Sequence, residues 1–286
     1  MPFVFKKLLD HGTTNPIVAR LSLQTLQLLN QSTATKDLRD KVGKLYVESL
    51  QRKLLRCWEI SERYRQEFNT AADTYKPPTA GARSVEVPQI PRLEEECHNY
   101  LYEAKNYIRD LLQVVNLLYG SDFREASEFY RARKGGVSLI EYATARFGKQ
   151  DEKTLFLEEA APGVEMLISL RNAVEHPDGY SGVLRIENFS LDPDGKIAEP
   201  TWHREKDGKP VTDPMPIRSF EIIVQNLLQL GEDVLVSWVA DNLKASQVMR
   251  VAMIPEDRRD PKCPIKWLVT ISPQLEARLK SLGAKN

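Results

Sequence analysis

The chain contains few cysteines and no apolar segment long enough to cross a membrane. Among its 286 residues are three cysteines, Cys57, Cys97 and Cys263, which are far apart and form no C-x-x-C pair. Their number and spacing exclude a disulfide framework and a structural zinc site, and they fit a reducing compartment. The first residues, MPFVFKKLLDHG, lack the apolar core of a secretion signal, and no apolar run reaches roughly 18 residues. We therefore expect a soluble cytoplasmic protein with no membrane-spanning segment.

The sequence also lacks an excess of charge of either sign. Forty basic and forty acidic side chains give a formal net charge of zero. Because no overall field draws such a protein to nucleic acid or to an anionic membrane, any nucleic-acid site must be local. A Gly-rich phosphate loop, a G-x-S-x-G elbow and an H-E-x-x-H motif are missing, as are the remaining ligands of a calcium loop around DPDG at 192–195. We expect neither a metal nor a cofactor.

Apolar residues recur at helical spacing along most of the chain, which predicts a mainly α fold. The segment 36–72 predicts one long helix with a possible break near Gly43, and 93–118 carries the most regular pattern. Pro177 forces the helix before it to stop, because a proline disfavours the α region for the preceding residue. The other predicted helices cover 122–133, 138–147, 151–160, 163–176 and 215–245.

Proline-rich and β-prone stretches divide the chain. Four prolines between Asp73 and Arg92 predict a surface connector. Short β-prone runs separated by the turn signals DPDG and KDG predict a small meander at 183–212, and two runs at 248–254 and 265–271 predict a terminal hairpin. The expected segments are an N-terminal helical region with the connector (1–90), a helical core that holds the β insertion (91–250) and a C-terminal β tail (251–286).

Polar side chains crowd the end of one predicted helix, in the stretch SLRNAVEHPDG at 169–179. Asn172 and His176 are four residues apart and share a helix face. Arg171 is five residues before His176, about 140° round the helix at 100° per residue. The arginine therefore reaches the same site only through its long side chain or from a second copy of the helix.

These residue types suit chemistry on a phosphodiester. The guanidinium of Arg171 offers a fork of donors that matches phosphate oxygens. His176 at a helix C-terminus meets the negative end of the helix dipole, which favours its protonated form. A protonatable imidazole beside a phosphate-binding arginine can move protons while a ribose 2′-hydroxyl attacks its own phosphodiester, without a metal. Asn172 would orient either partner.

The run Arg171-Asn172-Ala173-Val174-Glu175-His176 resembles the R-x4-6-H signature, in its RN-x3-H form, of the HEPN (higher eukaryotes and prokaryotes nucleotide-binding) domain family. The resemblance implies a bundle of four or five helices, here from 93–176 and 215–245. It also implies a homodimer whose composite site cuts single-stranded RNA and leaves a 2′,3′-cyclic phosphate. In that reading Arg171, Asn172 and His176 are the catalytic residues. Family members act as toxins, antiphage effectors or RNA-processing enzymes, so RNA and an antitoxin or defence-system partner are the expected partners.

Other readings of these residues stay open. Arg171 is placed to pair with Glu175 at i, i+4, and His176 to cap the last carbonyls of its helix. The same bundle would then be a catalytically inactive dimerising module that binds a protein or a nucleotide. A looser match, Arg92 with His98, has three glutamates between its ends that would repel a phosphate.

A second candidate is the basic run FYRARKGG at 129–136, in which Arg131, Arg133 and Lys134 stand beside an aromatic residue. Such a patch is able to hold an RNA backbone or stack a base. A solvated helix end, with cations at the negative end of the dipole and a glycine cap, explains the same residues.

Overall fold

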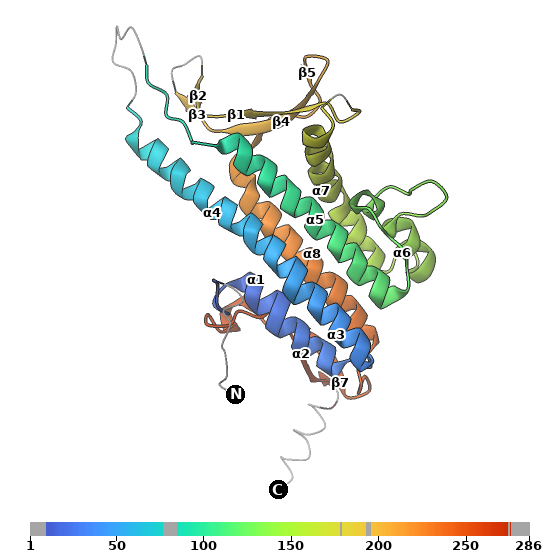
Figure 1. Cartoon of the computed structure of the whole chain (residues 1–286). Helices are drawn as coiled ribbons and strands as arrows, with labels where there is room; N and C mark the ends of the chain where they lie inside the picture. Colours follow the sequence, from blue (N-terminus) through green and yellow to red (C-terminus); the bar gives the residue numbers. More distant parts are fainter. Residues whose placement is uncertain (1–9, 77–84, 178, 193–195, 274, 276–286) are drawn as a thin grey trace, which may run out of the picture. The chain divides into compact units, whose positions relative to one another are not determined.

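The computed structural model describes residues 10–76, 85–177, 179–192, 196–273 and 275 (Figure 1). Within these residues the fold is mainly helical with small antiparallel sheets, which confirms the predicted class. The chain forms two compact units. Unit 1 holds the described residues of Met1–Arg52, Gln113–Asp122 and Leu228–Asn286, and unit 2 those of Lys53–Leu112 and Phe123–Leu227. The sequence-based segment limits at 90 and 250 stay predictions.

Unit 1 combines N-terminal helices with the C-terminal hairpin. The possible break near Gly43 does not occur, because α3 includes Gly43 and continues from Leu45 as a π-helical stretch. A Cβ at Gly43 would lie 3.1 Å from Cδ2 of Leu26, so this glycine permits a close approach of α2 instead. The bounds are α1 Pro16–Val18, π-helix η1 Ala19–Gln24, α2 Thr25–Gln31, α3 Lys36–Lys44, π-helix η2 Leu45–Leu50, β7 Met249–Met253, 3₁₀ turn η5 Glu256–Arg258 and β8 Trp267–Ile271. Strands β7 and β8 pair antiparallel, as predicted.

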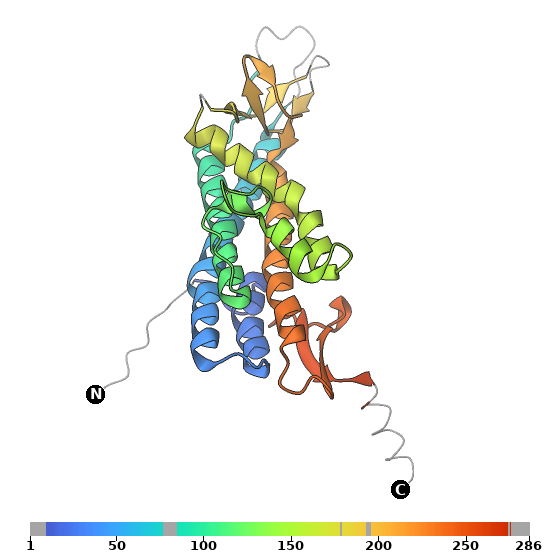
Figure 2. The same ribbon diagram turned by 90° about the vertical axis from the view of Figure 1, so that its right-hand side faces the viewer.

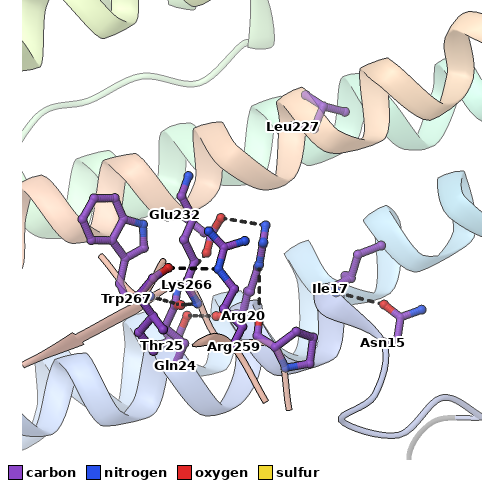
Figure 3. Close-up of polar contacts among 12 residues, drawn as sticks. Asn15, Ile17, Arg20, Gln24, Thr25, Leu227, Glu232, Arg259, Lys266 and Trp267 are labelled. Atoms are coloured by element: carbon purple, nitrogen blue, oxygen red, sulfur yellow. Dashed lines mark hydrogen bonds and ion pairs between the residues drawn. The ribbon is translucent and has the colours of Figure 1, made fainter. Parts of the chain in front are cut away.

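A buried polar network joins three parts of unit 1 (Figure 3). The side-chain oxygen of Gln24 accepts hydrogen bonds from the backbone N–H groups of Lys266 at 2.6 Å and Trp267 at 2.7 Å. Its amide nitrogen donates to Oε1 of Glu232 at 2.8 Å, and Oε2 of Glu232 lies 3.3 Å from Nη1 of Arg20. The network therefore fixes η1, α8 and the start of β8 to one another, with a fully buried carboxylate at its centre.

The helices of unit 2 include the most regular one predicted. α5 spans Leu93–Tyr119 and confirms the 93–118 prediction, whereas the helix expected at 122–133 is wrong. Only a 3₁₀ turn forms there, because the buried carboxylate of Glu128 accepts the backbone N–H groups of Arg124 at 2.7 Å and Glu125 at 2.9 Å. The bounds of the others are α4 Gln51–Thr74, η3 Ala126–Phe129, α6 Leu139–Phe147, α7 Glu152–Glu175, 3₁₀ turn η4 Ile217–Ser219 and α8 Phe220–Asp241. The residues of α5 from Gln113 on and those of α8 from Leu228 on belong to unit 1.

Helix α7 corrects the expectation of two helices at 151–160 and 163–176. It is one helix of 24 residues with Pro162 inside it. A proline removes one backbone donor and clashes with the preceding turn. Here Leu157 before it and Val164 after it are both buried. The core contacts on either side of Pro162 keep the two halves in one helix.

A small antiparallel sheet follows α7 in unit 2. It confirms the strands predicted at 183–212 but not their order as a meander, because β1 pairs with β4 and not with the next strand. Strands β1 Val183–Glu187, β4 Thr201–Lys206 and β5 Lys209–Pro210 lie in that order, β6 Met215–Pro216 also pairs with β4, and β2 Ser190–Leu191 pairs with β3 Ile197–Ala198. The KDG turn has φ of 53° at Asp207 and 72° at Gly208, while residues 193–195 of DPDG lie outside the described residues.

Aromatic packing attaches the sheet of unit 2 to its helices. The helix expected from 215 begins at Phe220, because β6 and η4 come first. The ring of Phe220 stacks on Tyr100 of α5 with centroids 3.9 Å apart and meets the indole of Trp202 of β4 edge-on at 5.1 Å. All three side chains are buried. This cluster positions β4, and with it the chain segment that leaves α7.

Candidate functional site

The end of α7 lies against the middle of α5 in unit 2, and α7 runs obliquely across α5 (Figure 2). Nζ of Lys105 on α5 lies 2.7 Å from Oε2 of Glu175 and 3.3 Å from Oδ1 of Asn172. These contacts bring a cation, a carboxylate and an amide together. The structure thus places Asn172, one of the residues predicted from the sequence, in a polar cluster with Lys105.

Arg171 joins the same cluster from the next position of α7. Its Nη2 lies 2.9 Å from Oε1 of Glu175, so the alternative i, i+4 ion pair forms. Its guanidinium carbon lies 5.5 Å from the ring centroid of Tyr102, within the range of a cation–π contact. The side chain is only 12% exposed, and within the described part of the chain Nε and Nη1 find no hydrogen-bond partner. The arginine is therefore held in place with two donor atoms unused.

Glu175 is the internal counterion of the cluster. Its carboxylate bridges Lys105 and Arg171 with one oxygen each. Partial burial by itself would raise the pKa of Glu175. The hydrogen bond from Lys105 and the charges of Lys105, Arg171 and His176 outweigh burial, so the pKa is lowered. The carboxylate is ionised at neutral pH and occupies the position that an external anion would take between the two cations.

His176 is the C-cap of α7. Its backbone N–H donates to the carbonyl of Asn172 at 2.8 Å, and its φ of −136° ends the helix before Pro177. The end of the helix at this position confirms the sequence prediction. The side chain of His176 is exposed, whereas Arg171 is mostly enclosed. An imidazole in this position meets solvent and any bound molecule directly.

Tyr180 extends the cluster beyond the helix end. Nδ2 of Asn172 donates to the hydroxyl of Tyr180 at 3.1 Å, and the tyrosine is 62% exposed. Burial raises the pKa of Tyr130 to about 12, with further raising by Tyr180 and Glu165 against the opposing charges of Arg131 and Arg204.

The other two residues of the basic run lie in the exposed loop that follows η3. Nε of Arg133 lies 3.3 Å from Oε1 of the buried Glu128, so Arg133 supports the 3₁₀ turn. Lys134 is exposed. Arg131 is exposed as well, and its charge lowers the pKa of the neighbouring Tyr130, against the effect of burial.

Two residues of α5 at the site, Tyr102 and Lys105, escaped the sequence analysis, which considered the third, His98, only in the looser match with Arg92. His98, Tyr102 and Lys105 follow one another at i, i+4 and i+7, a spacing that puts them on one helix face. Burial lowers the pKa of His98; the charge of Glu94 opposes this and that of Arg171 adds to it. Arg92, its partner in the looser motif, instead bonds Glu95 at 2.8 and 2.6 Å. The available signal was the polar stripe within an otherwise apolar helix.

Neither a metal site among the described residues nor a known relative explains the cluster at the end of α7. In the residues that the structure describes, no three His, Cys, Asp or Glu side chains gather in a way that would hold a metal ion. Over the same residues, no helix is both long and apolar enough to span a bilayer. No protein-family model matches the chain, and neither the curated proteins nor the solved structures include a significant match. The site must therefore be interpreted from its own residues.

Proposed function

We propose that this protein is a metal-independent endoribonuclease of HEPN type that cuts single-stranded RNA. One observation carries the proposal: the last turns of α7 and the facing side of α5 combine Arg171, with two unused donor atoms, Lys105 and an exposed His176. Two cations that share one carboxylate form a site suited to a phosphate, because the phosphate replaces that carboxylate charge for charge. The exposed imidazole adds a group that moves protons near neutral pH.

The proposed reaction is transfer within the RNA. The 2′-hydroxyl loses its proton to an imidazole while its oxygen bonds to phosphorus, and the bond from phosphorus to the 5′-oxygen breaks. The leaving 5′-oxygen takes a proton, so the products are a 2′,3′-cyclic phosphate and a 5′-hydroxyl. Arg171 and Lys105 balance the charge on the phosphoryl oxygens, His176 transfers the protons and Asn172 orients the site.

A homodimer is part of the proposal. Arg171 and His176 point about 140° apart on α7, so one copy of the helix presents them in different directions. A second α7 beside the first would set the histidine of one protomer near the arginine of the other. The helices α5, α7 and α8 would form the HEPN-like bundle. A toxin or antiphage role in the cytoplasm, with an antitoxin or defence-system partner, belongs to the same proposal.

A second candidate function is a catalytically inactive, dimerising module that binds a protein or a nucleotide. The observation that favours it is the ion pair between Arg171 and Glu175 at 2.9 Å, supplemented by Lys105. An arginine paired with Glu175 through one of its nitrogens stabilises the end of α7 without any chemistry.

Cleavage of RNA in EDTA separates the two functions. End-labelled single-stranded RNA is incubated with the wild-type protein, with His176→Asn and with His11→Asn, a matched control whose histidine belongs to unit 1. The ribonuclease predicts cutting in EDTA that the His176 variant loses by about 100-fold or more and the control retains. If the RNA stays intact with all three folded proteins, the result favours the inactive, dimerising module.

A further inference from the structure

Tyr102 and Tyr180 are unusual for their exposure. Within the described residues, they are the two aromatic side chains among the large apolar groups that face solvent, at 51% and 62%. Tyrosines are normally half-buried, with the ring packed and the hydroxyl wet. Two exposed rings in one unit therefore need an explanation. Both contact the segment 171–176 at the end of α7.

Each exposed ring contacts one residue of the motif. The guanidinium of Arg171 lies 5.5 Å from the ring centroid of Tyr102, and Nδ2 of Asn172 donates to the hydroxyl of Tyr180 at 3.1 Å. Because Arg171 and Asn172 are consecutive residues, they project about 100° apart from the helix. The two rings thus stand on different sides of the position proposed for the phosphate, and both contacts immobilise them.

A cation stands beside both contacts. Lys105 lies one helical turn after Tyr102 on α5, and its Nζ lies 3.3 Å from Oδ1 of the same Asn172 that donates to Tyr180. An acidic group is also present, because Glu175 bridges Lys105 and Arg171. Exposed aromatic rings beside cations are the arrangement with which proteins hold single-stranded nucleic acids, whose unpaired bases stack on the rings while the phosphates meet the cations.

From this geometry we infer that Tyr102 and Tyr180 are stacking platforms for the two bases next to the scissile phosphate and select single-stranded over double-stranded RNA. The inference rests on the proposed function and adds specificity-determining residues to the same site. A duplex keeps its bases stacked and paired within the helix, so the tyrosines gain nothing from it. The two platforms would leave the sequence preference weak, because every base has a stacking face.

Binding without cleavage is the test. All variants are made in the His176→Asn background, in EDTA, and the affinity for a fluorescent uridine-rich single strand and for the matching duplex is measured by anisotropy. Tyr102→Ala and Tyr180→Ala remove the rings, whereas Tyr102→Phe and Tyr180→Phe keep them and remove only the hydroxyls. Leu155→Ala, an exposed apolar residue at the start of α7, is the matched control. Circular dichroism verifies that each variant folds.

Each alanine substitution should weaken single-strand binding by about 5- to 150-fold, the effect of one lost stacking contact. Tyr102→Phe and the control should bind like the parent, and duplex binding should not change. Tyr180→Phe should lose less affinity than Tyr180→Ala, because it keeps the ring and loses only the hydrogen bond from Asn172. With an RNA that carries an abasic nucleotide next to the cleavage position, the parent and the alanine variants should bind with the same affinity, because the base that would stack is missing. Tyr102→Leu, which keeps an apolar side chain beside Arg171 but has no ring, should behave like Tyr102→Ala.

The outcomes separate this inference from the proposed function. Unchanged single-strand binding in the alanine variants, or an equal loss for the duplex, would overturn the stacking role even if the wild-type protein cleaves RNA. If binding depends on the rings but the wild-type protein never cleaves RNA, the stacking role is supported and the ribonuclease function is contradicted. If the parent does not bind RNA, the stacking role and the ribonuclease function are both contradicted.

Discussion

Glu175 holds Arg171 in the free protein: its Oε1 lies 2.9 Å from Nη2 of the arginine, while its Oε2 lies 2.7 Å from Nζ of Lys105. The carboxylate therefore occupies both cations that the proposed mechanism assigns to the phosphate. In the proposed mechanism, RNA has to displace this carboxylate or share the cations with it, so the ion pair between Arg171 and Glu175 competes with the phosphate.

Removing the charge of Glu175 should strengthen RNA binding. In the His176→Asn background, Glu175→Gln should bind a single-stranded RNA roughly tenfold more tightly, because a negative charge no longer competes with the phosphate. Glu159→Gln removes the same charge from an exposed position of α7 and should leave affinity unchanged apart from a small salt-dependent gain. Anisotropy titrations at two salt concentrations measure both. Weaker binding by Glu175→Gln would mean that the carboxylate serves to orient the cations.

Gly182 at the start of the β insertion is predicted to tolerate no side chain. Its φ is +73°, and an added Cβ would lie 2.2 Å from the carbonyl oxygen of Glu205 on β4. Gly208 has φ +72° with nothing within 4 Å, so Gly208→Ala carries the backbone strain without the collision. Both substitutions should destabilise through positive φ by about 1 kcal/mol, and Gly182→Ala by about 1–3 kcal/mol more. The free energy of unfolding of both variants is measured in urea. Equal losses in Gly182→Ala and Gly208→Ala would show that β1 moves away from β4 without cost.

The buried carboxylate of Glu232 in unit 1 predicts a pH dependence of stability. Burial raises its pKa above the ordinary 4.5, although the charge of Arg20, the hydrogen bond from Gln24 and the charge of Lys266 oppose this and Asp233 adds to it. Between 4.5 and the higher folded pKa the folded state binds more protons than the unfolded state. The contribution of Glu232 to stability thus falls as pH rises through this window.

Glu232→Gln lacks this titration and is the natural reference. The urea midpoint of unfolding is measured for both proteins from about pH 7 to pH 5. As the pH falls, the midpoint of the wild type should rise relative to that of Glu232→Gln. Asp233 and the other titrating groups are common to both proteins and cancel in the difference. A difference that is constant, or that grows in favour of the variant at low pH, would show that the carboxylate is ionised in the folded state throughout.

Periodicity predicted the elements whose apolar faces are continuous, and missed those that depend on how particular side chains pack or hydrogen-bond. α5 keeps an uninterrupted apolar face, so its bounds followed from the sequence. The break expected at Pro162 is wrong, because buried residues on both sides of the proline hold α7 together. The helix expected at 122–133 is wrong, because the carboxylate of Glu128 turns back to the backbone. Neither contact has a signature in the local pattern.

The candidate site shows the same division. Arg171, Asn172 and His176 stand within one helix end, and the possible pair of Arg171 with Glu175 followed from their i, i+4 spacing. Lys105 is 67 residues from Asn172, and only the packing of α5 against α7 brings the two together. The polar stripe on α5 marked a face that something would cover, but no local rule identifies its partner. Tertiary structure therefore supplied the second half of the cluster.

The chemistry of the RNA ends tests the account most directly. Single-stranded RNA is incubated with the wild-type protein in EDTA, and the termini of the fragments are identified by mass spectrometry, with His176→Asn in parallel. The proposed mechanism predicts fragments that end in a 2′,3′-cyclic phosphate and begin with a 5′-hydroxyl, and their loss in the variant. Fragments with a 5′-phosphate, or cyclic phosphates formed equally by His176→Asn, would contradict the role of Arg171 and His176 at the end of α7.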